Sequence, residues 1–220
     1  MTAKREIESK FELPIGKDIL LCTTEILEQI AQKGWNLTAT NLEPLHFVYY
    51  DTPQLDLYQQ GATLRRISGY PTTSKPKAAY RYDYKTGSLE NRMESTLWSR
   101  WEWNPEKIIK KLAPELEYTK LEEVAKTDTF SFKLYYKKWF TQVEVSVDAV
   151  SLVPEHPEKK KINYFGGDGP QKFRELEIEL LRGSEKRYEK LVHQLQEKLQ
   201  FTPINEQKYG RVIGMKKGNV

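Results

Sequence analysis

The chain opens with a segment in which charged and apolar positions alternate. One set of alternate positions holds only charged side chains, those of Lys4, Glu6, Glu8, Lys10 and Glu12. The other set includes Ile7, Phe11 and Leu13. Because successive side chains of a β-strand point to opposite faces, residues 4–13 are predicted to form a strand with one charged and one apolar face.

Seven further segments show a similar period of two and are predicted to be strands. They are residues 45–50, 62–68, 79–85, 97–103, 129–136, 142–148 and 173–180. The last of them sets three glutamates, at 175, 177 and 179, against aliphatic residues. Residues 86–96 are interpreted as a polar hairpin connection. Loops or turns are predicted at 69–76, 154–161 and 166–170.

Two longer segments show the helical spacing of apolar residues. Residues 18–33 carry one apolar stripe, and residues 184–199 carry another. Asn104 and Pro105 predict the start of a short third helix. About eight strands with two or three amphipathic helices indicate an α+β fold dominated by one antiparallel sheet.

Composition narrows the functional classes. The 35 basic and 31 acidic residues leave a net charge of only +4, so dedicated nucleic-acid binding is not expected. Cys22 is the only cysteine, which excludes an intrachain disulfide and a multi-cysteine metal site. No apolar run approaches the ~18 residues that span a membrane. We therefore expect a cytoplasmic protein without a membrane partner.

The charged strand faces have two interpretations. In the ordinary one, the polar face of an antiparallel sheet contacts water. The alternative follows from the stacked glutamates at 6 and 8 and at 175, 177 and 179, because like charges at neighbouring sheet positions repel unless a cation lies between them. Oxygen ligands suit Mg²⁺ or Mn²⁺, which binds carboxylates together with substrate phosphates.

Single bases lie on the charged faces of several strands. They are Lys10, Arg65, Arg81, Lys85, Arg100 and Lys133. If the sheet closes into a barrel with its charged faces inward, the carboxylates could hold metal on one side while the bases hold a row of phosphates. The apolar faces would then point outward, under the amphipathic helices.

Glu6-x-Glu8-x-Lys10 resembles the ExExK signature of the CYTH, or triphosphate tunnel metalloenzyme, superfamily. Further segments match this family in order, namely Tyr49-Tyr50-Asp51-Thr52-Pro53, Leu64-Arg65, Lys85, Arg100-x-Glu102, Glu144-x-Ser146-x-Asp148, Glu175-x-Glu177-x-Glu179 and Lys208. They extend over nearly the whole chain. The resemblance implies a single domain, residues 1–220, built as an eight-stranded antiparallel closed tunnel barrel with a charged interior.

The resemblance also implies roles for individual residues. The expected metal ligands are Glu6, Glu8, Glu177 and Glu179. The expected catalytic residues, as further ligands or water-orienting groups, are Glu102, Glu144, Asp148 and Glu175. The residues expected to bind phosphate oxygens are Lys10, Arg65, Arg81, Lys85, Arg100, Lys133 and Lys208.

The activity implied is hydrolysis of a small-molecule triphosphate, inorganic tripolyphosphate or a compound such as thiamine triphosphate, with Mg²⁺ or Mn²⁺. A class IV-type adenylate cyclase, an RNA 5′-triphosphatase and a non-catalytic polyphosphate- or nucleotide-binding module are the alternatives, and a homodimer is left open. Two residues depart from the family pattern. Ile67 replaces a usual arginine, and Lys133 stands where arginine is frequent, so weaker phosphate binding is expected.

Overall fold

A computed structural model describes residues 3–13, 19–69, 79–88, 92–116, 120–153 and 172–218 of the chain. Most of the predicted loop at 69–76, and those at 154–161 and 166–170, lie outside these residues. Within the described ranges, no helix has both the length and the apolar character needed to cross a membrane.

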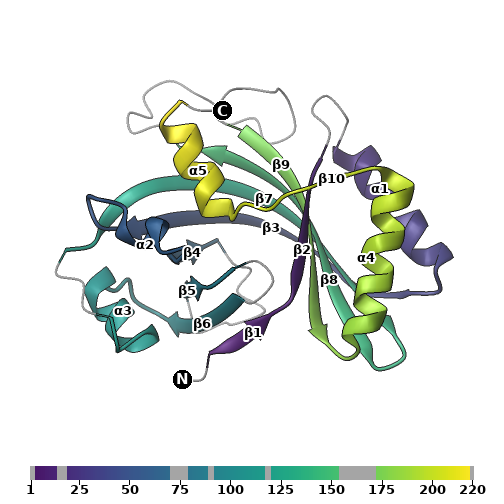
Figure 1. The fold of residues 1–220 in the computed structure, drawn as a ribbon, viewed down its shortest axis with the longest axis horizontal. Helices are drawn as coiled ribbons and strands as arrows, with labels where there is room; N and C mark the ends of the chain where they lie inside the picture. The colour runs from purple at the N-terminus through teal and green to yellow at the C-terminus, as the bar shows by residue number, and fades with distance from the viewer. Residues whose placement is uncertain are drawn as a thin grey trace.

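The described residues form one ten-stranded antiparallel sheet that is strongly curled (Figure 1). Its strands, in chain order, are β1 (Lys4–Glu6), β2 (Glu8–Glu12), β3 (Asn36–Asp51), β4 (Thr63–Ser68), β5 (Tyr80–Thr86), β6 (Arg92–Ser99), β7 (Glu122–Lys138), β8 (Thr141–Leu152), β9 (Lys172–Arg182) and β10 (Thr202–Pro203). Their order across the sheet is β1-β6-β5-β4-β3-β7-β8-β9-β2-β10.

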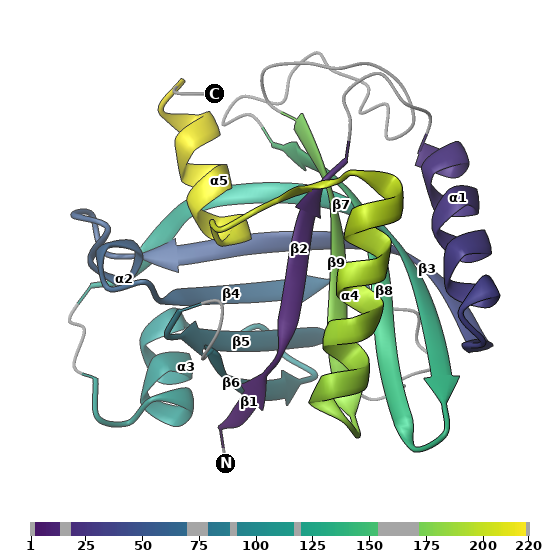
Figure 2. The same cartoon turned by 45° about the vertical axis from the view of Figure 1, so that its right-hand side comes forward.

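The two N-terminal strands lie far apart in this order although only Ile7 separates them along the chain. β1 pairs with β6, where Glu6 is opposite Arg92. β2 pairs with β9, where Glu8 is opposite Glu179. Figure 2 shows β1 and β2 running one after the other along the chain. The N-terminal segment therefore pairs with both β6 and β9.

Five helices accompany the sheet in the described residues. They are α1 (Ile19–Gln32), α2 (Asp56–Gln59), α3 (Pro105–Leu112), α4 (Glu185–Leu199) and α5 (Lys208–Lys216). α1 and α4 cover the apolar faces of β2, β8 and β9, where Ile26, Ile30, Leu191 and Leu195 pack among Val143, Val145, Val147 and Ile178. α3 packs in the same way on β4, β5 and β6 through Ile108, Ile109 and Leu112. The predicted arrangement of helices on apolar strand faces is confirmed for these three helices.

α5 departs from this arrangement because it packs on the face of the sheet from which the charged side chain of Arg65 projects. Tyr49 and Ile67 lie on the same face as Arg65, since Tyr49 is opposite Arg65 in the β3–β4 pairing and Ile67 lies two residues farther along β4. Both are buried against Val212 and Ile213 of α5. The expected charged interior is thus charged over one part and apolar at the end that α5 covers.

Several element boundaries differ from the sequence prediction. Residues 92–96, predicted as part of a connection, begin β6, because Arg92 pairs with β1 and residues 93–99 pair with β5. The predicted strand at 97–103 correspondingly ends at Ser99. β3 extends back to Asn36, and its first five residues are exposed on both faces, so they show no alternation of apolar and polar residues.

Candidate active site

The charged side chains of β2, β8 and β9 face one another by strand register. Across β2 and β9, Lys10 is opposite Glu177. Across β8 and β9, Asp148 is opposite Glu175 and Glu144 is opposite Glu179. Because directly opposed residues of an antiparallel pair project from the same face, these side chains form one continuous charged row.

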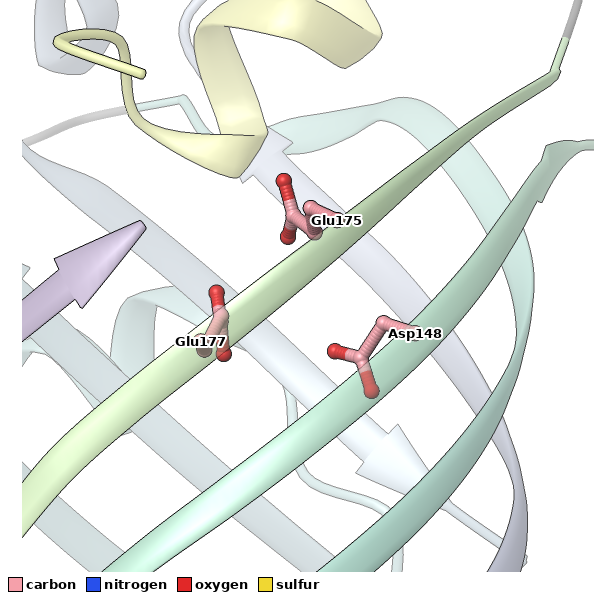
Figure 3. A group of neighbouring side chains, drawn as sticks. All are labelled: Asp148, Glu175 and Glu177. Carbon is pink, nitrogen blue, oxygen red and sulfur yellow. The ribbon is translucent and has the colours of Figure 1, made fainter. Parts of the chain in front are cut away.

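Three carboxylates of this row make a compact cluster, shown in Figure 3. Asp148, Glu175 and Glu177 each offer one oxygen, and these oxygens lie within 4.8 Å of one another. The ammonium group of Lys208, the first residue of α5, lies 2.7 Å from Asp148, 2.9 Å from Glu175 and 3.4 Å from Glu177. A buried cation therefore already occupies the centre of the acidic cluster.

The cluster has the chemistry of a site for a hard divalent ion. Its ligands are all oxygens, which Mg²⁺ and Mn²⁺ prefer. Oδ1 of Asp148 and Oε1 of Glu175 are buried and accept no hydrogen bond from the described residues, although Lys208 lies 2.9 Å from the latter, so Oδ1 of Asp148 is left for a ligand. The position of the Lys208 ammonium shows that a positive charge fits among the three carboxylates. The residues present thus fit a metal ion.

Burial and mutual attraction act in opposite directions on these groups. Burial alone would raise the pKa of Glu177, but Lys10 and Lys208 outweigh it and hold that pKa well below its usual range. Burial raises the pKa of Glu175, and Glu177 adds to the rise while Lys208 opposes it. Burial would lower the pKa of Lys208, yet Asp148, Glu175 and Glu177 keep it well above its ordinary value. The three carboxylates therefore keep Lys208 in its charged form.

Glu6 and Glu8, two of the expected metal ligands, lie farther along the row and are held by bases. Lys85 Nζ is 2.6 Å from Glu6. Arg92 contacts Glu8, and Lys10 lies 3.4 Å from Glu8. Glu179, another expected ligand, has a long contact of 3.9 Å with Lys4, and burial together with Glu6 raises its pKa to about 7. The ligand role of these three glutamates stays a prediction.

A second buried centre lies on β4, β5 and β6. Asp83 is fully buried and accepts hydrogen bonds from Arg65 at 3.0 Å, Arg81 at 2.6 Å and Thr96 at 3.0 Å. The two guanidinium groups hold the pKa of the Asp83 carboxyl well below its usual range despite burial. Arg81 also reaches Glu94 at 2.8 Å. Asp83 thus fixes two expected phosphate-binding arginines.

The β7–β8 side of the row carries its own pair. Lys133 Nζ lies 2.9 Å from Glu144 and 3.8 Å from Glu43. Ser146 donates a hydrogen bond to Glu144 at 3.0 Å. Burial would raise the pKa of Glu144, but Lys133 and these hydrogen bonds lower it. Both expected residues, Lys133 and Glu144, therefore lie on the charged face.

Arg100 and Glu102, which were expected in the site, lie elsewhere. β6 ends at Ser99, and Arg100 is exposed beyond it. The Glu102 side chain is 53% exposed and pairs with Arg66, whose guanidinium also lies over the Tyr80 ring. Arg66 follows Arg65 directly on β4 and so projects from the opposite face. The structure does not bring Arg100 and Glu102 to the charged row.

Four charged residues near the row were not expected there. Arg92 and Glu94 belong to the segment interpreted as a connection, although Arg92, Glu94 and Thr96 already alternate with less polar positions. Glu43 precedes Pro44, which argues against a central strand. Arg211 lies one helical turn after Lys208 and contacts Glu175 at 3.2 Å. The alternation of polar and less polar residues could have indicated Arg92 and Glu94. Arg211 was not expected in the site because the helix that carries it, α5, contains two glycines and was not predicted.

Comparison with known proteins places the chain in a family. A model of the CYTH domain matches residues 4–209. A search of the curated proteins found no match. Among solved structures, a candidate adenylate cyclase from Bacillus halodurans is 14% identical, with 96% of this chain and 98% of that one covered and a TM-score of 0.56. The PH1819 protein of Pyrococcus horikoshii is 17% identical, with 96% and 99% covered and a TM-score of 0.53.

A third structure is that of HpAC1 from Hippeastrum, a candidate adenylyl cyclase that has a dominant triphosphatase activity. It is 13% identical, with 98% of this chain and 97% of that one covered and a TM-score of 0.55. At these identities the structural likeness establishes the fold. The family model, in contrast, spans nearly the whole chain and includes the first strand, β8 and β9. This chain therefore belongs to the CYTH domain family.

Proposed function

We propose that this protein is a divalent-metal-dependent triphosphatase acting on inorganic tripolyphosphate or a related organic triphosphate such as thiamine triphosphate. The observation that carries the proposal is the charged face of the sheet, where buried and partly buried bases from several elements flank a cluster of three carboxylates. These bases are Lys10, Arg65, Arg81, Lys85, Arg92, Lys133 and Lys208. A linear triphosphate is a highly charged anion of the kind that such a row can hold.

We further propose that the sheet closes into an eight-stranded tunnel, in which β1 and β2 act as one strand. The pairings of β1 with β6 and of β2 with β9 support this closure, because Glu6 and Glu8 then lie opposite residues of the two outermost long strands. Closure would exclude water from the charged row and strengthen its electrostatic interactions.

Binding of substrate would exchange the partners of the charged residues. In the structure these bases hold carboxylates, as in Lys85 with Glu6 at 2.6 Å and Lys208 with Asp148 at 2.7 Å. On substrate binding, the bases would pair with phosphate oxygens, and the carboxylates of the cluster would hold a divalent ion. The ion would compensate the charge of the three carboxylates that lose Lys208, which offsets part of the desolvation of these buried groups.

We assign the metal to Asp148, Glu175 and Glu177. A divalent ion bound there supplies polarisation of the phosphoryl oxygens. Glu144 and Glu179, adjacent across β8 and β9, are suited to orient the attacking water and to accept its proton. The water oxygen bonds to the terminal phosphorus as the bridging P–O bond breaks, yielding orthophosphate and diphosphate. Lys10, Lys85 and Arg92 neutralise the charge that develops on the diphosphate.

The test is release of orthophosphate from tripolyphosphate, thiamine triphosphate and ATP in the presence of Mg²⁺ or Mn²⁺. Glu177→Gln should lower the rate on the order of a hundredfold or more, because it removes a ligand of an ion that supplies several kcal/mol. Glu197→Gln, at an exposed position of α4, is the matched control and should leave the rate unchanged. Failure to release phosphate from any of the three substrates would refute the enzyme assignment.

A second candidate function is non-catalytic binding of polyphosphate or nucleotides. It is favoured by Ile67, which places an apolar side chain under α5 where the family usually has an arginine. Titration calorimetry with tripolyphosphate distinguishes the two, since a binding module would bind the intact anion without turnover. Cyclic AMP formation from ATP would instead identify a cyclase, the activity suggested for the Bacillus and Hippeastrum proteins.

A further inference from the structure

The hairpin that joins β7 to β8 ends in two exposed aromatic residues. Lys138 pairs with Thr141, so Trp139 and Phe140 form the whole two-residue loop. Their exposed fractions are 70% and 84%. Trp139 has a φ of 58°, a conformation in which glycine or asparagine is favoured. The loop therefore places two large apolar side chains in water at a position better suited to small residues.

A basic cavity of about 750 Å³ lies beside this hairpin. It is bounded by the end of α1, the start of α4 and the hairpin, and its basic lining residues are Lys33, Lys138, Lys186, Arg187 and Lys190. The described residues that line it include no aspartate or glutamate. The guanidinium of Arg187 lies 5.8 Å from the centre of the Trp139 ring, which joins the cavity to the aromatic loop.

This surface is separate from the charged row of the sheet. α1 and α4 cover the apolar faces of β2, β8 and β9, whereas the carboxylates project from the opposite faces of β8 and β9. Figure 2 shows the β7–β8 hairpin, the end of α1 and the start of α4 at the same end of the molecule. The bases of the cavity therefore take no part in the triphosphate site.

We propose that this end of the protein docks on an anionic lipid surface. Trp139 and Phe140 would enter the interfacial layer, where aromatic rings of this kind are stabilised, and the bases of the cavity would hold lipid phosphates. Two features select a membrane over an acidic protein. The aromatic pair forms the tip of a hairpin and does not line the cavity. The bases of the cavity lie beside that tip, and the described residues that line the cavity include no acidic partner for them.

The proposal adds a peripheral contact that the sequence did not predict. The expectation of no membrane partner rested on the lack of a long apolar run, and a hairpin with two aromatic residues does not produce such a run. Attraction to the surface would depend on salt, because charges separated by more than about 8 Å are screened at physiological ionic strength. Binding would also require no metal and no triphosphate, so it can be measured independently of the proposed hydrolysis.

Co-sedimentation with vesicles tests the proposal. The full chain is mixed with vesicles of phosphatidylcholine alone or of phosphatidylcholine with phosphatidylglycerol. We expect sedimentation only with the anionic vesicles, and less of it at high salt. The double variant Trp139→Gly/Phe140→Asn should lower the partition coefficient about tenfold or more, and replacing Lys186 or Lys190 by Gln should lower it about fivefold each.

The hairpin variant keeps the fold, because Gly-Asn is typical of two-residue hairpin loops. Trp101→Ser is the matched control, since Trp101 is 74% exposed at a distant connection, and it should sediment like the unmodified chain. Equal sedimentation of the hairpin variant would overturn the proposal. The proposal would also be overturned if inorganic phosphate abolished sedimentation with vesicles while the hairpin variant sedimented normally, because this result indicates a site for a soluble anion. Concentration-dependent self-association that the hairpin variant abolishes, without vesicle binding, would assign the surface to a second copy of the chain.

Discussion

Replacing Asp83 by asparagine should destabilise the protein more than any other single change of charge to amide on β4, β5 or β6. Asp83 is fully buried and is the shared acceptor of Arg65, Arg81 and Thr96. The asparagine side chain would keep the shape but remove the negative charge between two guanidinium groups, and its amide hydrogens would face donors. The two arginines would then repel each other at close range.

The size of the effect follows from burial. Removing one partner of a fully buried ion pair costs about 3–5 kcal/mol. The Arg65 and Arg81 side chains are 14% and 24% exposed, so water relieves part of this cost. We expect a loss of about 2–4 kcal/mol in the free energy of unfolding. Urea unfolding followed by tryptophan fluorescence measures it.

Thr96→Val provides the control, because it removes a single hydrogen bond to Asp83 and should cost about 1 kcal/mol. A second check is the double variant Asp83→Asn/Arg81→Gln, which should cost less than the sum of its parts because the repulsion is relieved. A loss below about 1 kcal/mol for Asp83→Asn would refute the interpretation that this carboxylate holds the two arginines.

The same carboxylate predicts a pH dependence of stability. The pKa of Asp83 is depressed in the folded state. Its contribution is therefore complete above the unfolded pKa, about 3.9, and is lost as the pH falls through the lower folded value. The difference in unfolding free energy between the unmodified chain and Asp83→Asn should stay constant from pH 7 to about pH 5 and shrink below about pH 4. A constant difference down to about pH 2 would contradict this.

Three further predictions address other parts of the molecule. Ile67→Arg, which restores the usual family residue, should cost about 3 kcal/mol or more because Ile67 is 2% exposed under α5; unchanged urea unfolding would contradict this. Lys208→Gln should make the melting temperature rise more on addition of Mg²⁺ or Mn²⁺ than in the unmodified chain, because the carboxylates lose their internal cation; an equal rise would place the ion elsewhere. Gly183→Ala should lower the melting temperature strongly, since φ is +106° and a Cβ would lie 2.6 Å from Thr141 Cα. Gly61→Ala is the control and should lower the melting temperature less, because its Cβ meets no atom within 4 Å; equal losses would contradict the prediction.

The sequence predicted the parts of the fold in which each strand has one apolar and one charged face. β2, β8 and β9 are of this kind, and alternation alone places the carboxylates of each strand on a single face. β3 was predicted poorly because its first residues are exposed on both faces and it contains Pro44. Strand alternation determines the face of a side chain but says nothing of its partner.

The composition of the acidic cluster was harder to predict for the same reason. Glu6 and Glu8 share the charged face with Glu177, but register and the reach of Lys85 and Arg92 pair them with bases. Asp148 and Glu175 come together only because β8 and β9 are adjacent in a particular register. α5, which brings Lys208 to the cluster, contains Gly210 and Gly214 and has a weak helical signal in the sequence.

The position of the first strand has a consequence for how the protein folds. Lys10 reaches Glu177, which lies 167 residues later in the chain, and Lys85, the partner of Glu6, lies 79 residues after it. During synthesis this segment must therefore remain with its backbone edge unpaired until β9 has also been made. Contacts of such long range slow folding. The rate at which the N-terminal strand joins β9 should consequently limit the formation of the native state, and the alternating charges of that strand help to keep it from pairing with other chains during the wait.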